Sequence, residues 1–178
     1  GYAVGGGSEL ALCADLVVAS EDARIGTPYS RVWGCHLTGM WIYRLGLAKA
    51  KYYALTGDWI SGREAAEIEL INFSCPLEEL DDRVQVLAEK LTKIPLTQLV
   101  AMKLVVNQAY DNMGLQGTQT LGPILDGIMR NTTEGREFVR IAAQEGVAGV
   151  IAKRDGPFGD YSQAPRDQQP RRRSELGR

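Results

Sequence analysis

The sequence predicts an α/β fold in which a small sheet comes first and a series of helices follows. Two observations predict it. Residues 1–30 combine glycine-rich turns with short apolar, β-branched runs, a pattern typical of buried strands. Beyond Gly34, apolar residues recur at helical spacing in successive segments. The chain shows no internal repeat, and its 178 residues suit one domain of ordinary size.

Composition and charge exclude several classes of protein. The chain has 20 Lys and Arg residues against 22 Asp and Glu residues, so its net charge of −2 provides no field for capturing nucleic acid. No apolar stretch of the sequence is long enough to span a membrane. The three cysteines lack a CxxC spacing and the chain has a single histidine. We therefore expect neither a metal site nor a disulfide framework, and we predict a reducing, cytoplasmic compartment.

The first 76 residues contain the predicted strands. Short apolar runs bounded by turn residues indicate strands, and a Ser followed three residues later by Glu indicates a helix start. The expected elements are a short helix at residues 9–13, strands at 16–19 and 23–26, a helix begun by a capping box at 61–64, and an extended segment at 71–76.

Residues 77–154 are expected to be helical. From Glu78 onward, apolar residues at i, i+4, i+7 and i+11 form one face of a helix, and Pro95 stands where a second helix can start. Two further apolar faces follow, and the last of them is expected to end near Gly146. The sheet predicted upstream is too small to cover all of these faces.

The two ends of the chain carry predictions of their own. The chain opens on Gly1 in an apolar, glycine-rich segment, and we expect a natural N-terminal half to be missing. Residues 155–178 hold three of the seven prolines and the run Arg171 to Arg173, with almost no aliphatic residues. Such a composition cannot bury enough surface to offset the entropy of ordering. We therefore expect a mobile C-terminal tail whose arginine run is a solvated charge block rather than a contact for RNA or membranes.

The first 15 residues contain a specific motif. GYAVGGGSELALCAD resembles the G-x-A-x-G-G-G-x-E-L-A-x-x-x-D signature of the crotonase (enoyl-CoA hydratase/isomerase) superfamily. Further matches follow in the family's order at residues 19–26, 43–46, 54–58 and 64–76. The resemblance covers about residues 1–155. It implies the C-terminal part of a crotonase-like spiral ββα core over residues 1–76, and a helical oligomerisation region over residues 77–154.

The resemblance also implies a function. The protein is expected to be an acyl-CoA-converting enzyme of the enoyl-CoA hydratase/isomerase type, a lyase of fatty acid metabolism. Coenzyme A would enter as the thioester of the substrate, with no separate cofactor and no metal. The amide of Gly6 would be one of two backbone donors to the thioester oxygen, forming an oxyanion hole, and Glu9 would be the catalytic acid/base. Glycines ahead of a short helix suit this role, because bare backbone N–H groups can approach a ligand closely.

Further residues complete the site that the resemblance implies. Gly5 and Gly7 flank Gly6 in the substrate-binding turn. Trp33 would shape an acyl pocket, although it could instead be a core or subunit-contact residue. Lys153 lies where the family places basic groups near the coenzyme A of a neighbouring subunit, although a solvated helix end explains it equally well. The expected pocket wall includes Ser30, Arg31 and His36, each of which is more often a structural group than a catalyst. The family further implies a homotrimer or a hexamer.

Departures from the family pattern leave the reaction open. Tyr29 stands where hydratases have their second catalytic glutamate, and a phenol, whose ordinary pKa is about 10, cannot be a carboxylate base at neutral pH. The loop after Trp33 lacks the family's P-x-x-G-G-x pattern, and Glu69 replaces a usual glycine. Tyr29 could still donate a proton or a hydrogen bond. The alternatives are a CoA-thioester hydrolase or decarboxylase on the same scaffold, or a catalytically incomplete fragment or assembly subunit.

Overall fold

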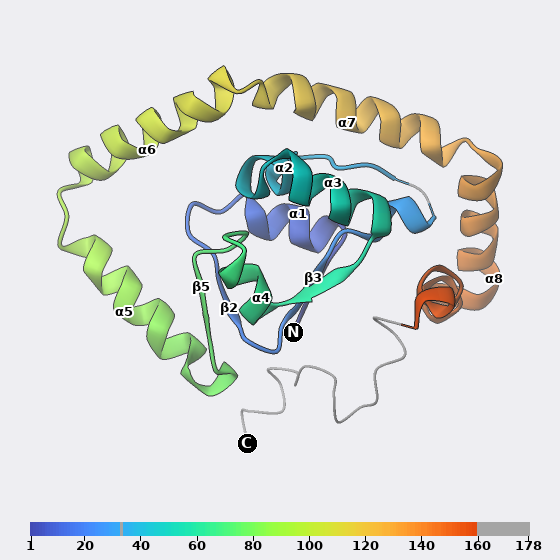
Figure 1. The fold of residues 1–178 in the computed structure, drawn as a ribbon, viewed down its shortest axis with the longest axis horizontal. Helices are drawn as coiled ribbons and strands as arrows, with labels where there is room; N and C mark the ends of the chain where they lie inside the picture. The colour runs from blue at the N-terminus through green and yellow to red at the C-terminus, as the bar shows by residue number, and fades with distance from the viewer. Residues whose placement is uncertain (33, 160–178) are drawn as a thin grey trace.

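The computed structural model describes residues 1–32 and 34–159. Two small sheets lie near the centre of the molecule (Figure 1). In the first sheet, β1 (Tyr2–Val4) pairs in parallel with β3 (Arg24–Gly26), and β3 pairs antiparallel with β4 (Trp59–Ser61). In the second, β2 (Val18–Ser20) pairs in parallel with β5 (Phe73–Cys75).

Short helices pack with the sheets around one hydrophobic core. They are α1 (Gly6–Leu12), α2 (Met40–Leu45), α3 (Leu47–Thr56) and α4 (Gly62–Glu67), with the 3₁₀ turns η1 (Pro28–Arg31) and η2 (Leu77–Glu79). Leu12, Trp41 and Leu70 are fully buried at the centre of this core. Burial of each such large side chain contributes about 1.5–3 kcal/mol, so this region has its own source of stability.

The capping box predicted at Ser61 is confirmed. The Ser61 hydroxyl accepts the N–H group of Glu64 at 3.1 Å, and the Glu64 carboxylate accepts the N–H group of Ser61 at 2.8 Å. The strands predicted at residues 16–19 and 23–26 are also present, as β2 and β3, within two residues at each end. The sequence pattern does not predict β1 and β4, which both pair with β3.

Long helices follow one another in a wide arc around the sheets (Figure 1). They are α5 (Leu80–Thr92), α6 (Leu96–Asn112), α7 (Leu115–Arg130) and α8 (Thr133–Asp155). No residue of α5 or α6 is buried, and the apolar side chains of α6 between Val100 and Val106 are largely exposed. The predicted helices are therefore confirmed, while the apolar faces of α5 and α6 stay uncovered by the described part of the chain. Among the described residues, no helix has the length and hydrophobicity that a membrane crossing requires.

The C-terminal helix extends further than the sequence predicts. Gly146 does interrupt it, with φ of 68° and ψ of −168°, but a helical segment resumes and runs to Asp155. A 3₁₀ turn, η3 (Gly156–Phe158), follows. Asp155 is fully buried and pairs with Arg31. Residues 155–158 therefore belong to the fold, contrary to the tail boundary predicted at 155, because a buried charge pair holds them. Residues 160–178, including the run Arg171 to Arg173, lie outside the described residues.

The backbone conformation at Glu69 explains why glycine is usual at this position in the family. It has a φ of 67°, and among the described residues no other non-glycine residue has a positive φ. In this left-handed conformation a Cβ approaches the backbone too closely, which costs about 1–2 kcal/mol for an ordinary residue and little for glycine. The turn after α4 thus keeps its backbone shape although the residue that suits it has been replaced.

Candidate active site

The glycine turn between β1 and α1 forms the first part of the site. Gly5 has φ of 56° and ψ of −124°, which would strain any side chain there. Its N–H group donates to the Gly26 carbonyl on β3 at 2.9 Å, and its own carbonyl accepts the N–H group of Glu9 at 3.1 Å. Gly6 and Gly7 are exposed, and no acceptor within the described residues takes their N–H groups. The first turn of α1 therefore keeps two backbone donors for a ligand.

Ser8 links the glycine turn to helix α2. The side chain is fully buried, and its hydroxyl donates to the Gly5 carbonyl at 2.8 Å. The same oxygen accepts the indole N–H group of Trp41, which is itself fully buried in the core, at 3.0 Å. These buried bonds fix the start of α1, and with it the position of the next residue, Glu9.

Glu9 carries a carboxylate that is only 2% exposed. Its Oε1 lies 2.7 Å from Nδ1 of His36. Its Oε2 accepts the backbone N–H group of Thr38 at 2.9 Å and also accepts the Thr38 hydroxyl. Burial is the largest single influence and raises the pKa of Glu9, but the hydrogen bonds from His36 and Thr38 together outweigh it and hold the pKa below its ordinary value of 4.5. Glu9 is therefore an ionised, fixed anion at neutral pH.

Helix α7 holds the loop at residues 34–39 that supplies both partners of Glu9. Gly122 in this helix lies so close to the loop that a Cβ there would be 2.0 Å from the carbonyl oxygen of His36. The side-chain amide of Gln119 donates to the carbonyl of Thr38 at 3.1 Å. A helix from the second half of the chain thus sets the geometry around a carboxylate in the first ten residues.

Tyr29, in η1, lies between the glycine turn and this loop. Its Cδ1 would be 2.7 Å from a Cβ on Gly34, and its Cε1 and Oη would be 3.9 and 4.0 Å from a Cβ on Gly5. The ring meets that of His36 edge to face, with the centroids 5.8 Å apart and the planes at 84°. The absence of a side chain at Gly34 makes room for the phenol, whereas a Cβ at Gly5 would be at ordinary van der Waals distance from it.

The charge state of Tyr29 follows from its surroundings. Burial raises the pKa of Tyr29 to about 12, and the negative charges of Glu9 and of Asp126 on α7 act in the same direction. The carboxylate of Asp126 is itself held by the Arg130 guanidinium at 2.7 Å. Tyr29 is therefore a neutral phenol that can donate a hydrogen bond and cannot act as a base.

Taken as chemistry, the arrangement combines two unused backbone donors, a fixed anion and a neutral phenol. The donors suit an oxygen on which negative charge develops, and the anion suits the proton transfer that accompanies it. Within residues 1–32 and 34–159, no group of three His, Cys, Asp or Glu side chains is placed to hold a metal ion.

Comparison with known proteins decides the family. The sequence model described as enoyl-CoA hydratase/isomerase matches residues 1–159. The chain belongs to this family. The crystal structure of an enoyl-CoA hydratase from Mycobacterium smegmatis is 41% identical to this member, with a TM-score of 0.88, and the match covers 92% of this chain and 56% of that one. An enoyl-CoA hydratase/isomerase from Xanthobacter autotrophicus Py2 is 28% identical, with a TM-score of 0.78, over 88% of this chain and 59% of that one.

The mitochondrial enoyl-CoA hydratase of Pongo abelii is 29% identical over 163 residues, which are 90% of this chain and 53% of that relative. The chain spans about half the length of the curated relatives it matches. The crotonase-like fold that the first 15 residues predict is confirmed by these neighbours. This enoyl-CoA hydratase/isomerase family member brings together Gly5 to Gly7, Glu9 and Tyr29, which the sequence assigned to one site.

Two other residues predicted for the site are not placed there. Trp33 lies outside the described residues. Lys153 is exposed on α8, and its ammonium lies 3.5 Å from the carboxylate of Glu137 on the same helix. Its assignment to coenzyme A stays a prediction.

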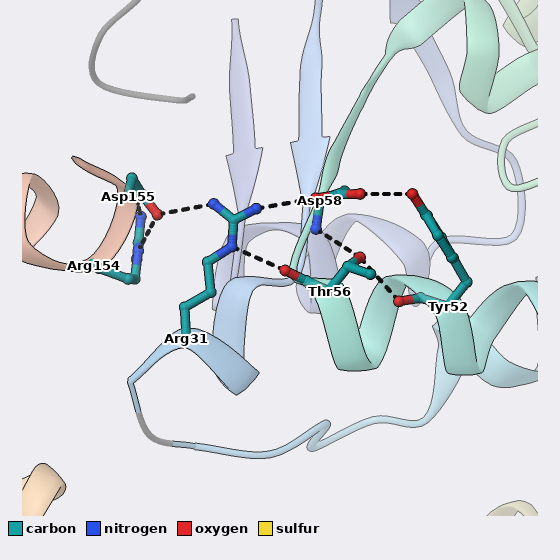
Figure 2. A network of polar contacts seen from close by, with 6 residues as sticks. All are labelled: Arg31, Tyr52, Thr56, Asp58, Arg154 and Asp155. Carbon is teal, nitrogen blue, oxygen red and sulfur yellow. Dashed lines mark hydrogen bonds and ion pairs between the residues drawn. The ribbon is translucent and has the colours of Figure 1, made fainter. Parts of the chain in front are cut away.

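Arg31, which was expected in the pocket wall, belongs to a separate polar network (Figure 2). Its side chain is 1% exposed, and its Nε donates to the carbonyl of Thr56 at 3.0 Å. Its two terminal nitrogens lie 3.2 Å from Asp58 and 3.5 Å from Asp155. Arg31 therefore has the structural role that was favoured for it over a catalytic one: the guanidinium joins η1, the end of α3 and the end of α8.

Sequence reasoning missed the partners of Glu9. It assigned no role to Thr38, and it placed His36 only in the pocket wall. A signal existed in the composition, because His36 is the single histidine of the chain. No spacing rule connects it to Glu9, since the two residues are 27 positions apart and meet through a loop of irregular structure.

Proposed function

We propose that this protein converts acyl-CoA thioesters by chemistry of the enoyl-CoA hydratase/isomerase type. The observation that carries the proposal is the unused N–H group of Gly6 next to the buried, ionised Glu9, in a chain of that family. The Gly6 amide is one donor to the thioester oxygen and stabilises the negative charge that develops there as an enolate forms. Loss of one such donor typically raises a reaction barrier by roughly 3–4 kcal/mol.

Glu9 supplies the anion on which proton movement at C2 and C3 of the acyl group depends. Gly5 and Gly7 complete the turn that admits the thioester, because neither presents a side chain to it. Coenzyme A arrives and leaves as part of the substrate and product, so the proposed reaction needs no separate cofactor. Trp33 and Lys153 remain proposed contacts for the acyl group and for coenzyme A.

The proposed assembly is a homotrimer or a hexamer in the cytoplasm. Helices α5 and α6 contain no buried residue and display many exposed apolar side chains, which suits a region that packs against other copies. Light scattering of the full-length protein at micromolar concentration is expected to give a multiple of three protomers. A monomer would contradict the proposed assembly.

The substitution Glu9→Gln tests the function. In the full-length protein we expect it to lower the turnover of crotonyl-CoA hydration at least about 100-fold, because an amide cannot hold the negative charge that proton transfer requires. Glu67→Gln, at an exposed position on α4, is the matched control and should leave turnover unchanged. Turnover near that of the wild type in Glu9→Gln would contradict the role of Glu9. A wild type that converts no acyl-CoA would instead favour the incomplete fragment or assembly subunit.

A second candidate, a CoA-thioester hydrolase or decarboxylase, is favoured by Tyr29. This neutral phenol occupies the position of the second carboxylate, so water addition with two carboxylates lacks one of its groups. If the protein is nevertheless a hydratase of that kind, Tyr29→Glu should raise crotonyl-CoA hydration. If Tyr29 instead donates a hydrogen bond to a different substrate, the carboxylate introduced by Tyr29→Glu must be desolvated or protonated. Crotonyl-CoA hydration should then stay low, and the rate of the native reaction should fall as well.

Tyr29→Phe separates the hydroxyl from the ring, because it keeps the packing between the two glycines. We expect it to impair the native reaction, identified by product analysis with several acyl-CoAs. Full activity in Tyr29→Phe would show that the ring only forms the wall of the site.

A further inference from the structure

The carboxylate of Glu9 has little capacity left for a substrate. An ionised carboxylate offers about four lone-pair positions. Three of these are used by the His36 ring, the Thr38 backbone N–H group and the Thr38 hydroxyl. The residue is only 2% exposed, so little of the carboxylate is open to a substrate. A group placed in this way can orient a neighbour more readily than it can reach a substrate atom.

The imidazole of His36 is that neighbour. Because the carboxylate has no proton to give, the bond at 2.7 Å assigns the hydrogen to Nδ1 of the ring, which donates it to Glu9. In the neutral ring this leaves a lone pair on Nε2. Within the described residues, Nε2 has no hydrogen-bond partner. The side chain is 13% exposed, so unlike Glu9 it is accessible from outside.

The ring of His36 also lies next to Tyr29, which borders the glycine turn. It packs edge to face on Tyr29, and Tyr29 in turn lies against Gly5 at the glycine turn. The imidazole thus stands between the fixed anion and the phenol that borders the turn. The carbonyl of His36 is pressed against Gly122 of α7, which leaves the backbone at this position little freedom.

We propose that His36 is the catalytic residue that moves the proton, and that Glu9 is its positioning residue. This inference rests on the proposed function, since it names the group that touches the acyl chain in that reaction. Glu9 orients the ring through Nδ1 and offsets the positive charge that the ring gains, as the carboxylate does in a Ser-His-Asp triad.

The reaction can be written with each proton and electron pair placed. Nε2 takes a proton from water while the water oxygen forms a bond to C3 of a 2,3-enoyl thioester. The electrons of the C2=C3 bond move toward the thioester carbonyl, giving an enolate at the oxygen that Gly6 stabilises. The imidazolium then returns the proton from Nε2 to C2 as the carbonyl reforms. Water has been added across the double bond, and both His36 and Glu9 end in their starting states.

The substitution His36→Asn separates this role from a purely structural one. The amide nitrogen of Asn takes the place of Nδ1 and keeps the hydrogen bond to Glu9, but no group remains in the place of Nε2. His36→Gln is the matched variant, because its amide nitrogen takes the place of Nε2 without being able to accept and return a proton. We expect both variants to lower kcat for crotonyl-CoA hydration at least about 100-fold in the full-length protein, with little change in KM. In His36→Ala, added imidazole should restore part of the lost rate.

Three outcomes decide the proposal. Loss of kcat in both amide variants, with rescue of His36→Ala by imidazole, supports it. Retention of the wild-type rate in His36→Asn would overturn the role of His36 but not the proposed function. The hydrogen bond to Glu9 would then be sufficient for catalysis, and the proton transfer would be assigned to Glu9 again. A wild type inactive toward every acyl-CoA tested would overturn the proposed function and this inference together. Circular dichroism of each variant shows whether a lost rate reflects unfolding, and imidazole rescue tests the role of His36 independently, since an unfolded protein is not rescued.

Discussion

Glu9 and Arg31 are both buried charges, yet their partners differ in kind. Arg31 faces the carboxylates of Asp58 and Asp155 and the carbonyl of Thr56. Glu9 is held by the neutral donors of Thr38 and by His36, whose charge depends on its protonation. Removal of one member of a buried ion pair is strongly destabilising, because it leaves the partner charge buried and unpaired. A buried charge held by neutral donors and a titratable ring is suited to proton transfer.

The position of the Arg31 network explains why stability is needed there. The guanidinium lies at the end of η1, and Asp155 lies at the end of α8, more than a hundred residues later (Figure 2). The ring of Phe158 adds a cation–π contact, with the guanidinium carbon 4.0 Å from its centroid. These contacts fasten the end of the helical arc to the sheet region, whereas the Glu9 contacts join neighbouring parts of one site.

The largest expected effect comes from breaking the Arg31 network. We expect Arg31→Met to lower the free energy of unfolding by about 3 kcal/mol, because Asp155 stays buried while losing one of its two cationic partners. Arg31→Lys should lose less, since it keeps the charge but not the planar fork. Arg63→Met, which removes an exposed ion pair to Glu21, is the control and should cost less than about 1 kcal/mol. Urea unfolding measures all three, and a loss for Arg31→Met as small as the control's would refute the structural role.

A smaller effect is expected from weakening the Glu9 contacts with Thr38→Val. This change removes the hydroxyl donor and keeps the backbone donor, so it should lower the free energy of unfolding by about 1–2 kcal/mol at pH 7. The lost contribution depends on pH with a definite sign. Because the pKa of Glu9 lies below 4.5 in the folded protein, its stabilisation is complete above that pH and disappears as the pH falls through the folded value.

The two proteins should therefore differ most above about pH 4.5 and converge in acid. Urea unfolding at several pH values between 7 and 3 measures this convergence. An equal difference at every pH would mean that the Thr38 hydroxyl stabilises the fold through packing rather than through the ionised carboxylate.

The smallest effect concerns an acidic residue that is neither buried nor catalytic. Glu69 is exposed and has a φ of 67°, so Glu69→Gly should relieve backbone strain and raise the free energy of unfolding by about 0.5–1 kcal/mol. Glu67→Gly, at the end of α4, is the matched control and should lower stability by up to about 1 kcal/mol, because glycine is a poor helix former. Thermal unfolding compares them. Destabilisation by both substitutions would show that the Glu69 side chain makes a contact that outweighs the strain.

Much of the fold could be predicted because it depends on neighbours in the chain. The capping box at Ser61 involves residues three apart, and the helix that begins after Pro95 is visible in the spacing of its apolar residues. The motif around Gly6 and Glu9 likewise fits within a few residues. Strands β1 and β4 were not predicted. Both pair with β3, and pairing between separate segments of the chain is not visible in a local pattern.

The sequence by itself determined the family, the small sheet followed by a series of helices, and the glycine turn with Glu9, because each is a local pattern of residue types. Only the tertiary structure decided that His36 and Thr38 enclose Glu9, and that Asp155 belongs to the core rather than to a tail. The structure also explains why glycine is usual at the position of Glu69, because the backbone there is left-handed. Buried polar groups must find partners wherever the folded chain brings donors and acceptors within reach. That requirement produces no periodic pattern in the sequence. The partners of Glu9 and Asp155 are therefore decided only by the packing of α7 and α8 against the first sixty residues.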